Sequence, residues 1–215
     1  MTNIFDHESP EYGESWNKLV GDKYNGAYYY AKEIKQNIIP RVQTDYNWVL
    51  VNKYGYCWDH SIVFIHNNRC PAIYNWLKDY KDLILITGVP RTAKKLEYLG
   101  HKTLYLPLSI DVKYVQQFRK ERKTKSHAIV GRFNKIKYDI PPNCGVLTNM
   151  PREQLLQGMA DYKYIYAVGR CAIEAKILGC SILPYDKRYP NPALWEIYDN
   201  SIAAEFLNIA LKGMK

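Results

Sequence analysis

Short apolar runs alternate with helical segments along this chain, and this alternation limits the fold more than any other feature. Apolar runs rich in β-branched and aromatic residues predict strands at 46–55, 61–68, 82–88, 101–108, 126–133, 145–148, 163–169 and 180–186. Helical patterns occupy 24–42, 70–81, 90–100, 151–162, 170–179, 192–200 and 201–213. Strands that alternate with helices of this length form βαβ units with parallel sheets. The pattern therefore predicts an α/β fold with two small Rossmann-like lobes.

A charge-dense segment at 111–125 separates the two halves of this pattern. We expect residues 1–20 to form a polar arm and 21–110 to form the N-terminal lobe. Residues 111–125 are expected to be a basic helix and linker, and 126–215 to form the C-terminal lobe. In open parallel sheets, ligands bind beyond the carboxyl ends of the strands. The turns after Ile65, Ile86, Val130 and Val168 should therefore lie near any site.

The chain is basic, with 30 Lys and Arg against 21 Asp and Glu and a formal charge of +9. This charge favours anionic partners such as nucleotide diphosphates, nucleic acid or acidic lipid surfaces. The strongest basic run, Arg119–Lys125, either contacts nucleic acid phosphates or is a solvated helix face or linker. The 20 tyrosines are explained either by an AT-rich genome or by selection for aromatic and basic binding.

Cysteine usage and the N-terminus indicate a cytoplasmic protein. The five cysteines are odd in number and form no C-x-x-C pair, so free buried thiols are expected rather than disulfides or structural zinc. The first residues contain no apolar signal region, and no apolar run approaches the roughly 18 residues of a membrane span. No residues have metal-ligand spacing, and we expect neither a metal nor a cofactor.

The stretch 166–180, YAVGRCAIEAKILGC, carries the strongest local signal. A predicted strand ends at Val168, and Gly169 allows the backbone to turn and approach a ligand closely. The helix that follows directs its positive end at the same place, where a diphosphate would bind and Arg170 would add a charged contact. Alternatively, Gly169 only turns the chain, and Glu174 is an ordinary acid in the first part of a helix.

The longer stretch Gly169–Asp186, GRCAIEAKILGCSILPYD, resembles the donor-site motif of GT-B glycosyltransferases. The resemblance implies that Glu174 binds the ribose of the donor nucleotide. It also implies that backbone amides from Gly169 through Arg170 to Cys171 hold the donor phosphates. The segment AIVGRFNKIK is similar to the first strand and loop of the donor domain in that family. By this likeness Arg132, with Lys135 or Lys137, contacts the diphosphate.

Two further segments follow the order of the same family. LYLPLSID is similar to the segment that ends the N-terminal domain, with Pro107 and Asp111 at the crossing. The segment 144–166 is similar to the strand and helix that flank the nucleotide base. The chain departs from the pattern at Ala167, where related retaining enzymes usually have a second Glu, and in its short length.

The resemblance implies a glycosyltransferase that moves a sugar from a nucleotide-diphosphate donor such as UDP-glucose. The acceptor is a carbohydrate, a lipid-linked sugar or a modified base of DNA, as for some phage enzymes of this fold. The alternative is a non-catalytic nucleotide- or nucleic-acid-binding protein derived from the GT-B fold, which Ala167 favours. Whether the configuration of the sugar is retained stays open.

The acceptor side has fewer candidates. His66 follows a predicted strand, where it would act as a base or bind an anion, and Asp59 lies just before the same strand. A turn or core histidine is the alternative. Gly88 precedes a predicted helix, with Arg91 in its first turn, and these two residues would line the acceptor side.

Overall fold

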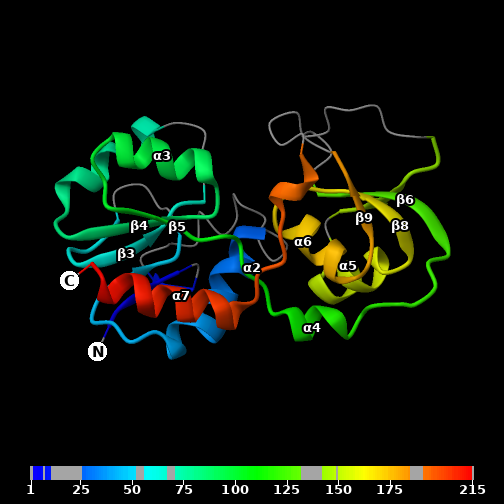
Figure 1. The fold of residues 1–215 in the computed structure, drawn as a ribbon, viewed down its shortest axis with the longest axis horizontal. Coiled ribbons are helices and arrows are strands. Elements are labelled where there is room, and N and C mark those ends of the chain that lie inside the picture. Colours follow the sequence, from blue (N-terminus) through cyan, green and yellow to red (C-terminus); the bar gives the residue numbers. More distant parts are fainter. Residues whose placement is uncertain are drawn as a thin grey trace. The chain divides into compact units, whose positions relative to one another are not determined.

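The computed structural model describes residues 2–6, 8–10, 26–51, 56–66, 71–131, 142–148, 150–184 and 191–214. The chain divides into two compact units (Figure 1). Unit 1 contains Met1–Pro107 and Ser201–Lys215, and unit 2 contains Leu108–Asn200. Each unit has its own parallel sheet, which confirms the predicted α/β class with two parallel sheets.

The sheet of unit 1 has five parallel strands in sequential order, β1-β2-β3-β4-β5. Its strands are β1 (Ile4–Phe5), β2 (Asn47–Val49), β3 (Ser61–Phe64), β4 (Leu83–Thr87) and β5 (Thr103–Tyr105). The inner strand β4, between β3 and β5, reads LILIT and is buried throughout. Such a continuous apolar run is typical of a parallel strand that is covered on both faces. Each fully buried side chain of this kind contributes about 1.5–3 kcal/mol.

Helices cover this sheet on two sides. In Figure 1, α3 lies on one side of the strands and α7 on the other. Asn208 of the C-terminal helix α7 bonds to the segment that precedes β2. Its side chain accepts a hydrogen bond from Gln43 N and donates one to Arg41 O. The helical elements are α2 (Gly26–Glu33), the π-helix η3 (Ile34–Ile38), the 3₁₀-helices η4 (Ile39–Arg41) and η5 (Pro71–Asp79), α3 (Pro90–Tyr98) and α7 (Asn200–Lys212).

The sheet of unit 2 has four parallel strands in the order β7-β6-β8-β9. Its strands are β6 (Lys125–Val130), β7 (Gly145–Leu147), β8 (Tyr162–Tyr166) and β9 (Ser181–Leu183). The chain goes from β6 to β7 on one side, and from β8 to β9 on the other side. The direction of the connections therefore reverses between the neighbouring strands β6 and β8.

The core of unit 2 lies between one face of this sheet and the helices that pack on it. These are α4 (Val112–Gln116), α5 (Arg152–Met159) and α6 (Arg170–Ile177), with a 3₁₀ turn η7 (Pro192–Leu194). Ala128 of β6 and Ile165 of β8 are fully buried in one cluster with Leu156 of α5 and Ile173 of α6. Gly179, with a φ of 77°, ends α6 as the sequence predicts.

Several sequence expectations differ from the structure. The expected polar arm includes β1, because Phe5 is fully buried and pairs with β2. The helix predicted at 192–200 is only the 3₁₀ turn η7, and the segment predicted as an α-helix at 70–81 forms the 3₁₀-helix η5. Residues 201–215, expected in the C-terminal lobe, belong to unit 1, and 111–125 belong to unit 2.

Candidate functional site

The carboxyl edge of the second sheet has the topology of a ligand site. In open parallel sheets, ligands bind where the direction of the connections reverses, which here is between β6 and β8. Both strands are followed by glycines with positive φ, 113° at Gly131 and 62° at Gly169. Other residues rarely adopt such angles. The backbone thus turns sharply at both strand ends that flank this reversal.

Gly169 makes the transition from β8 to α6. Its φ of 62° and ψ of −136° lie in a region that is largely restricted to glycine. A Cβ atom at this position would meet only Leu108 Cδ1, at 3.9 Å, so conformation rather than space demands the glycine. The N–H groups of Ala172 and Ile173 donate to the Gly169 carbonyl, so α6 begins directly after the carboxyl end of β8. This end of the helix dipole favours an anion.

A buried cluster of two arginines and one glutamate lies beside this helix start. Arg152 Nη1 donates to Glu174 Oε1 at 2.6 Å, and Arg170 Nε donates to the same oxygen at 2.8 Å. The exposed fractions of the side chains are 12% for Arg152, 8% for Arg170 and 2% for Glu174. The guanidinium group of Arg152 also lies 5.8 Å from the ring centre of Tyr114. Glu174 therefore joins the first residues of α5 and α6.

The described contacts of this cluster set two guanidinium groups against one carboxylate. Removing two guanidinium groups and a carboxylate from water is costly, and short hydrogen bonds to the carboxylate offset that cost. Cys171, next to Arg170, has its pKa raised to about 12, first by burial and then by the Glu174 carboxylate. The thiol is therefore neutral at physiological pH, and it offers no thiolate to a substrate.

The structure brings several predicted donor-site residues together. Gly169, Arg170, Cys171 and Glu174 form the start of α6, as their sequence spacing requires. The predicted contacts of Arg132, Lys135 and Lys137 lie outside the described residues. Glu174 is bonded to two arginines, a role that the sequence did not predict.

Arg152 is the site residue that sequence reasoning missed. It is the first residue of α5, which follows β7, and it is 22 positions from Glu174. No local spacing connects the two residues. The available signal was Arg152 in the first turn of a predicted helix, where a cation is unfavourable without a carboxylate partner.

In unit 1, His66 lies just beyond the carboxyl end of β3. Its Nε2 donates to Leu50 O at 2.7 Å, and the rings of Tyr30 and Phe64 lie 5.7 and 6.5 Å away. Burial lowers the pKa of His66. The imidazole is therefore neutral, and it carries its proton on Nε2 because a carbonyl only accepts.

Asp59 does not lie with His66. It precedes the amino end of β3, and its Oδ1 accepts from Lys81 N at 2.7 Å. The four residues of β3 separate the two side chains, which places them at opposite edges of the sheet. The structure therefore does not bring the two candidate catalytic residues His66 and Asp59 together, because one precedes the strand and the other follows it.

Gly88 and Arg91 lie at the same edge as His66. Phe64 of β3 pairs with Ile86 of β4, and His66 and Gly88 lie two residues beyond these partners, at neighbouring strand ends. Arg91 is exposed in the first turn of α3. The φ of Gly88 is not positive, so its backbone conformation does not require glycine.

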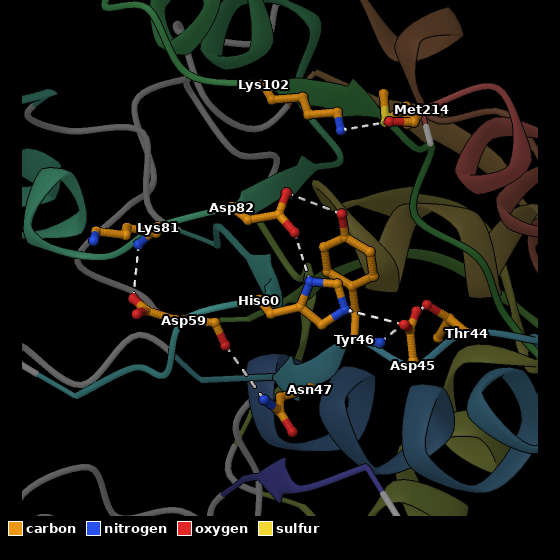
Figure 2. A network of polar contacts seen from close by, with 10 residues as sticks. All are labelled: Thr44, Asp45, Tyr46, Asn47, Asp59, His60, Lys81, Asp82, Lys102 and Met214. Carbon is orange, nitrogen blue, oxygen red and sulfur yellow. Dashed lines mark hydrogen bonds and ion pairs between the residues drawn. The ribbon is translucent and has the colours of Figure 1, made fainter.

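A separate polar network lies at the amino edge of the first sheet (Figure 2). The ring of His60 stacks on Tyr46 at 3.7 Å, its Nδ1 is 2.5 Å from Asp82 Oδ2, and its Nε2 is 3.4 Å from Asp45 Oδ2. Tyr46 donates its hydroxyl to Asp82. His60 lowers the pKa of Asp82, while burial and Asp82 raise the pKa of Tyr46 to about 12. This network joins β2, β3 and β4 away from the carboxyl edge.

Comparison with family models, curated proteins and solved structures found no match. Within the described ranges, no group of three or more His, Cys, Asp or Glu residues could hold a metal ion. Among the same residues, no helix combines the length and apolarity that a membrane span needs.

Proposed function

We propose that this protein is a glycosyltransferase that binds a nucleotide-diphosphate sugar at the carboxyl edge of the second sheet. The observation that carries the proposal is the Arg152–Glu174–Arg170 cluster beside the N-terminus of α6, at the reversal of strand order. The helix dipole and the two guanidinium groups both favour a diphosphate at this place. The resemblance of Gly169–Asp186 to the GT-B donor motif supports the same assignment.

In this proposal Glu174 is a positioning residue as well as the ribose contact that the resemblance implies. Its Oε1 holds both guanidinium groups, which limits their rotamers before a ligand arrives. A preorganised cation stabilises charge that develops on a leaving group without the cost of reorganisation. The departing nucleoside diphosphate develops such charge when the glycosidic bond breaks. Arg170 and the first amides of α6 would accommodate it.

The proposed acceptor side uses the carboxyl edge of the first sheet, with His66, Gly88 and Arg91. His66 is a neutral imidazole, the protonation state that a general base requires. The proposal leaves out Asp59, which lies at the opposite edge.

The test is calorimetry with UDP and with UDP-glucose. Wild-type protein should bind both, and Arg170→Lys should weaken UDP binding about 10-fold, because lysine keeps the charge but loses the forked donor geometry. Glu174→Gln should weaken it as well by releasing the arginines. The matched control is Glu121→Gln, which removes an exposed carboxylate from the segment between α4 and β6 and should leave binding unchanged. Absence of UDP binding by the wild type would rule out the donor site.

One observation favours a non-catalytic binding protein as the second candidate. Ala167, where related retaining enzymes have a second Glu, is 1% exposed at the end of β8. Release of UDP from UDP-glucose, measured with carbohydrate, lipid-linked and modified-DNA acceptors, separates the two candidates. UDP binding without turnover on any of them would favour the binding protein.

A further inference from the structure

A row of polar and aromatic side chains crosses one face of the second sheet. His127 of β6 pairs with Tyr164 of β8, which pairs with Ser181 of β9. The rings of His127 and Tyr164 are nearly parallel, with centroids 4.8 Å apart and an interplanar angle of 21°. The ring of Tyr166 lies 6.2 Å from His127. Tyr164 is 39% exposed and Ser181 is exposed, while His127 and Tyr166 are half-buried.

The other face of the same strands is the core of the unit. Ala128 and Ile165, which alternate with His127 and Tyr164 along the two strands, are fully buried. Parallel sheets are normally covered on both faces and read as continuous apolar runs. Here that pattern is broken at His127, which is half-buried, and at Tyr164, which is exposed, whereas Ile129 farther along the same face of β6 is buried. Tyrosine and histidine on a wet face offer flat rings with polar ends, which suits binding more than core packing.

Basic residues lie at the start of β6, at one end of this row. Lys125 precedes His127 by two residues on β6, so it lies on the same face, and its side chain is 55% exposed. Arg122 and Lys120, in the segment that leads into β6, are also exposed. Asp161 neutralises only part of this charge by pairing with Lys120 and Lys125. Across residues 108–200 there are 15 Lys and Arg against 9 Asp and Glu.

We propose that this face binds single-stranded nucleic acid, whose bases stack on Tyr164 and His127 and whose phosphates contact Lys125 and Arg122. Unpaired bases expose the flat surfaces that stack on aromatic side chains, and a basic margin attracts the backbone. A duplex hides those surfaces between its base pairs, so charge alone would hold it. The inference is independent of the proposed donor site.

The test is fluorescence anisotropy with a labelled oligothymidylate of about 15 nucleotides, near the upper end of common site sizes. Tyr164→Ala should weaken binding about 5-fold to 100-fold, the range that loss of one or more stacked bases produces. Tyr164→Phe should bind like the wild type, because the ring rather than the hydroxyl stacks. Tyr98→Ala is the matched control, since Tyr98 is 91% exposed on α3 of unit 1 and should be neutral.

Salt and competitors decide whether stacking contributes. Affinity should fall with salt, and Lys125→Ala should reduce the slope of log K against log salt by about 0.7. A duplex of equal length should bind more weakly. The proposal is overturned if the wild type does not bind the oligonucleotide at low salt. It is also overturned if Tyr164→Ala, shown to be folded by circular dichroism, binds as tightly as the wild type. Equal competition by inorganic polyphosphate of the same charge would overturn it as well.

Discussion

Replacement of Glu174 by glutamine tests the central cluster most directly. The substitution keeps the size of the side chain and removes its charge. It leaves Arg152 and Arg170, which are 12% and 8% exposed, without their shared carboxylate. Removing one partner of a buried ion pair costs about 3–5 kcal/mol, since the remaining charge stays buried. The glutamine oxygen still accepts a hydrogen bond, so we expect the lower end, about 3 kcal/mol.

A loss of that size is readily measured. For a domain of 60–100 residues, 1 kcal/mol lowers the melting temperature by about 4–8 °C, so unit 2 should melt at least 10 °C lower. Urea unfolding followed by circular dichroism gives the free energy, and Glu121→Gln, a change at an exposed acid, should alter it by less than about 0.5 kcal/mol. A double-mutant cycle of Arg152→Ala with Glu174→Gln should show coupling of about 1–3 kcal/mol. Equal losses for the two glutamine variants, with no coupling, would refute the buried ion pairs.

Three further predictions concern separate positions. Gly169→Ala should destabilise the protein by about 1–3 kcal/mol in thermal melting, because its φ of 62° and ψ of −136° strain any other residue; an unchanged melting temperature would contradict this backbone geometry. Burial lowers the pKa of His66. Below about pH 6.5 the imidazole therefore binds a proton in the unfolded chain but stays neutral in the folded chain. Stability should therefore fall from pH 7 to pH 5, and His66→Gln should flatten that slope in urea titrations. Burial raises the pKa of Cys57 to about 11 and that of Cys171 to about 12, so at pH 8 both should react with iodoacetamide far more slowly than in urea, which peptide mass spectrometry measures.

The sequence predicted those parts of the fold in which local pattern and burial agree. The run LILIT was predicted as a buried strand, and it is β4, an inner strand of the first sheet. The strand β1 was missed because two residues are too few to show a period. The helix predicted at 192–200 does not continue past η7. The Ile110 N–H bonds to Tyr198 O, and Asn200 N bonds to Ile110 O, so tertiary pairing extends this segment despite its helical pattern.

The candidate site divides in the same way. Gly169, Arg170 and Glu174 fall within two turns of one helix, so their spacing alone places them together. The contact of Arg152 with Glu174 joins two helices that follow different strands, and only the order of strands in the sheet creates it. Asp59 precedes and His66 follows one strand, as the sequence places them, so the structure holds them at opposite edges of the sheet.

The two sheets differ in a way that favours unit 2 for the donor. The described strands of the first sheet follow one another in sequence, so the connections never reverse and no crevice of this topological kind forms among them. The second sheet reverses between β6 and β8, beside the arginine cluster. Its proposed nucleic-acid face uses the same two strands but different residues, His127 and Tyr164, earlier along each strand. Tyr164→Ala should therefore weaken oligonucleotide binding and spare UDP, while Arg170→Lys should do the reverse. If either variant weakened both ligands alike, the two proposed sites would have to be one.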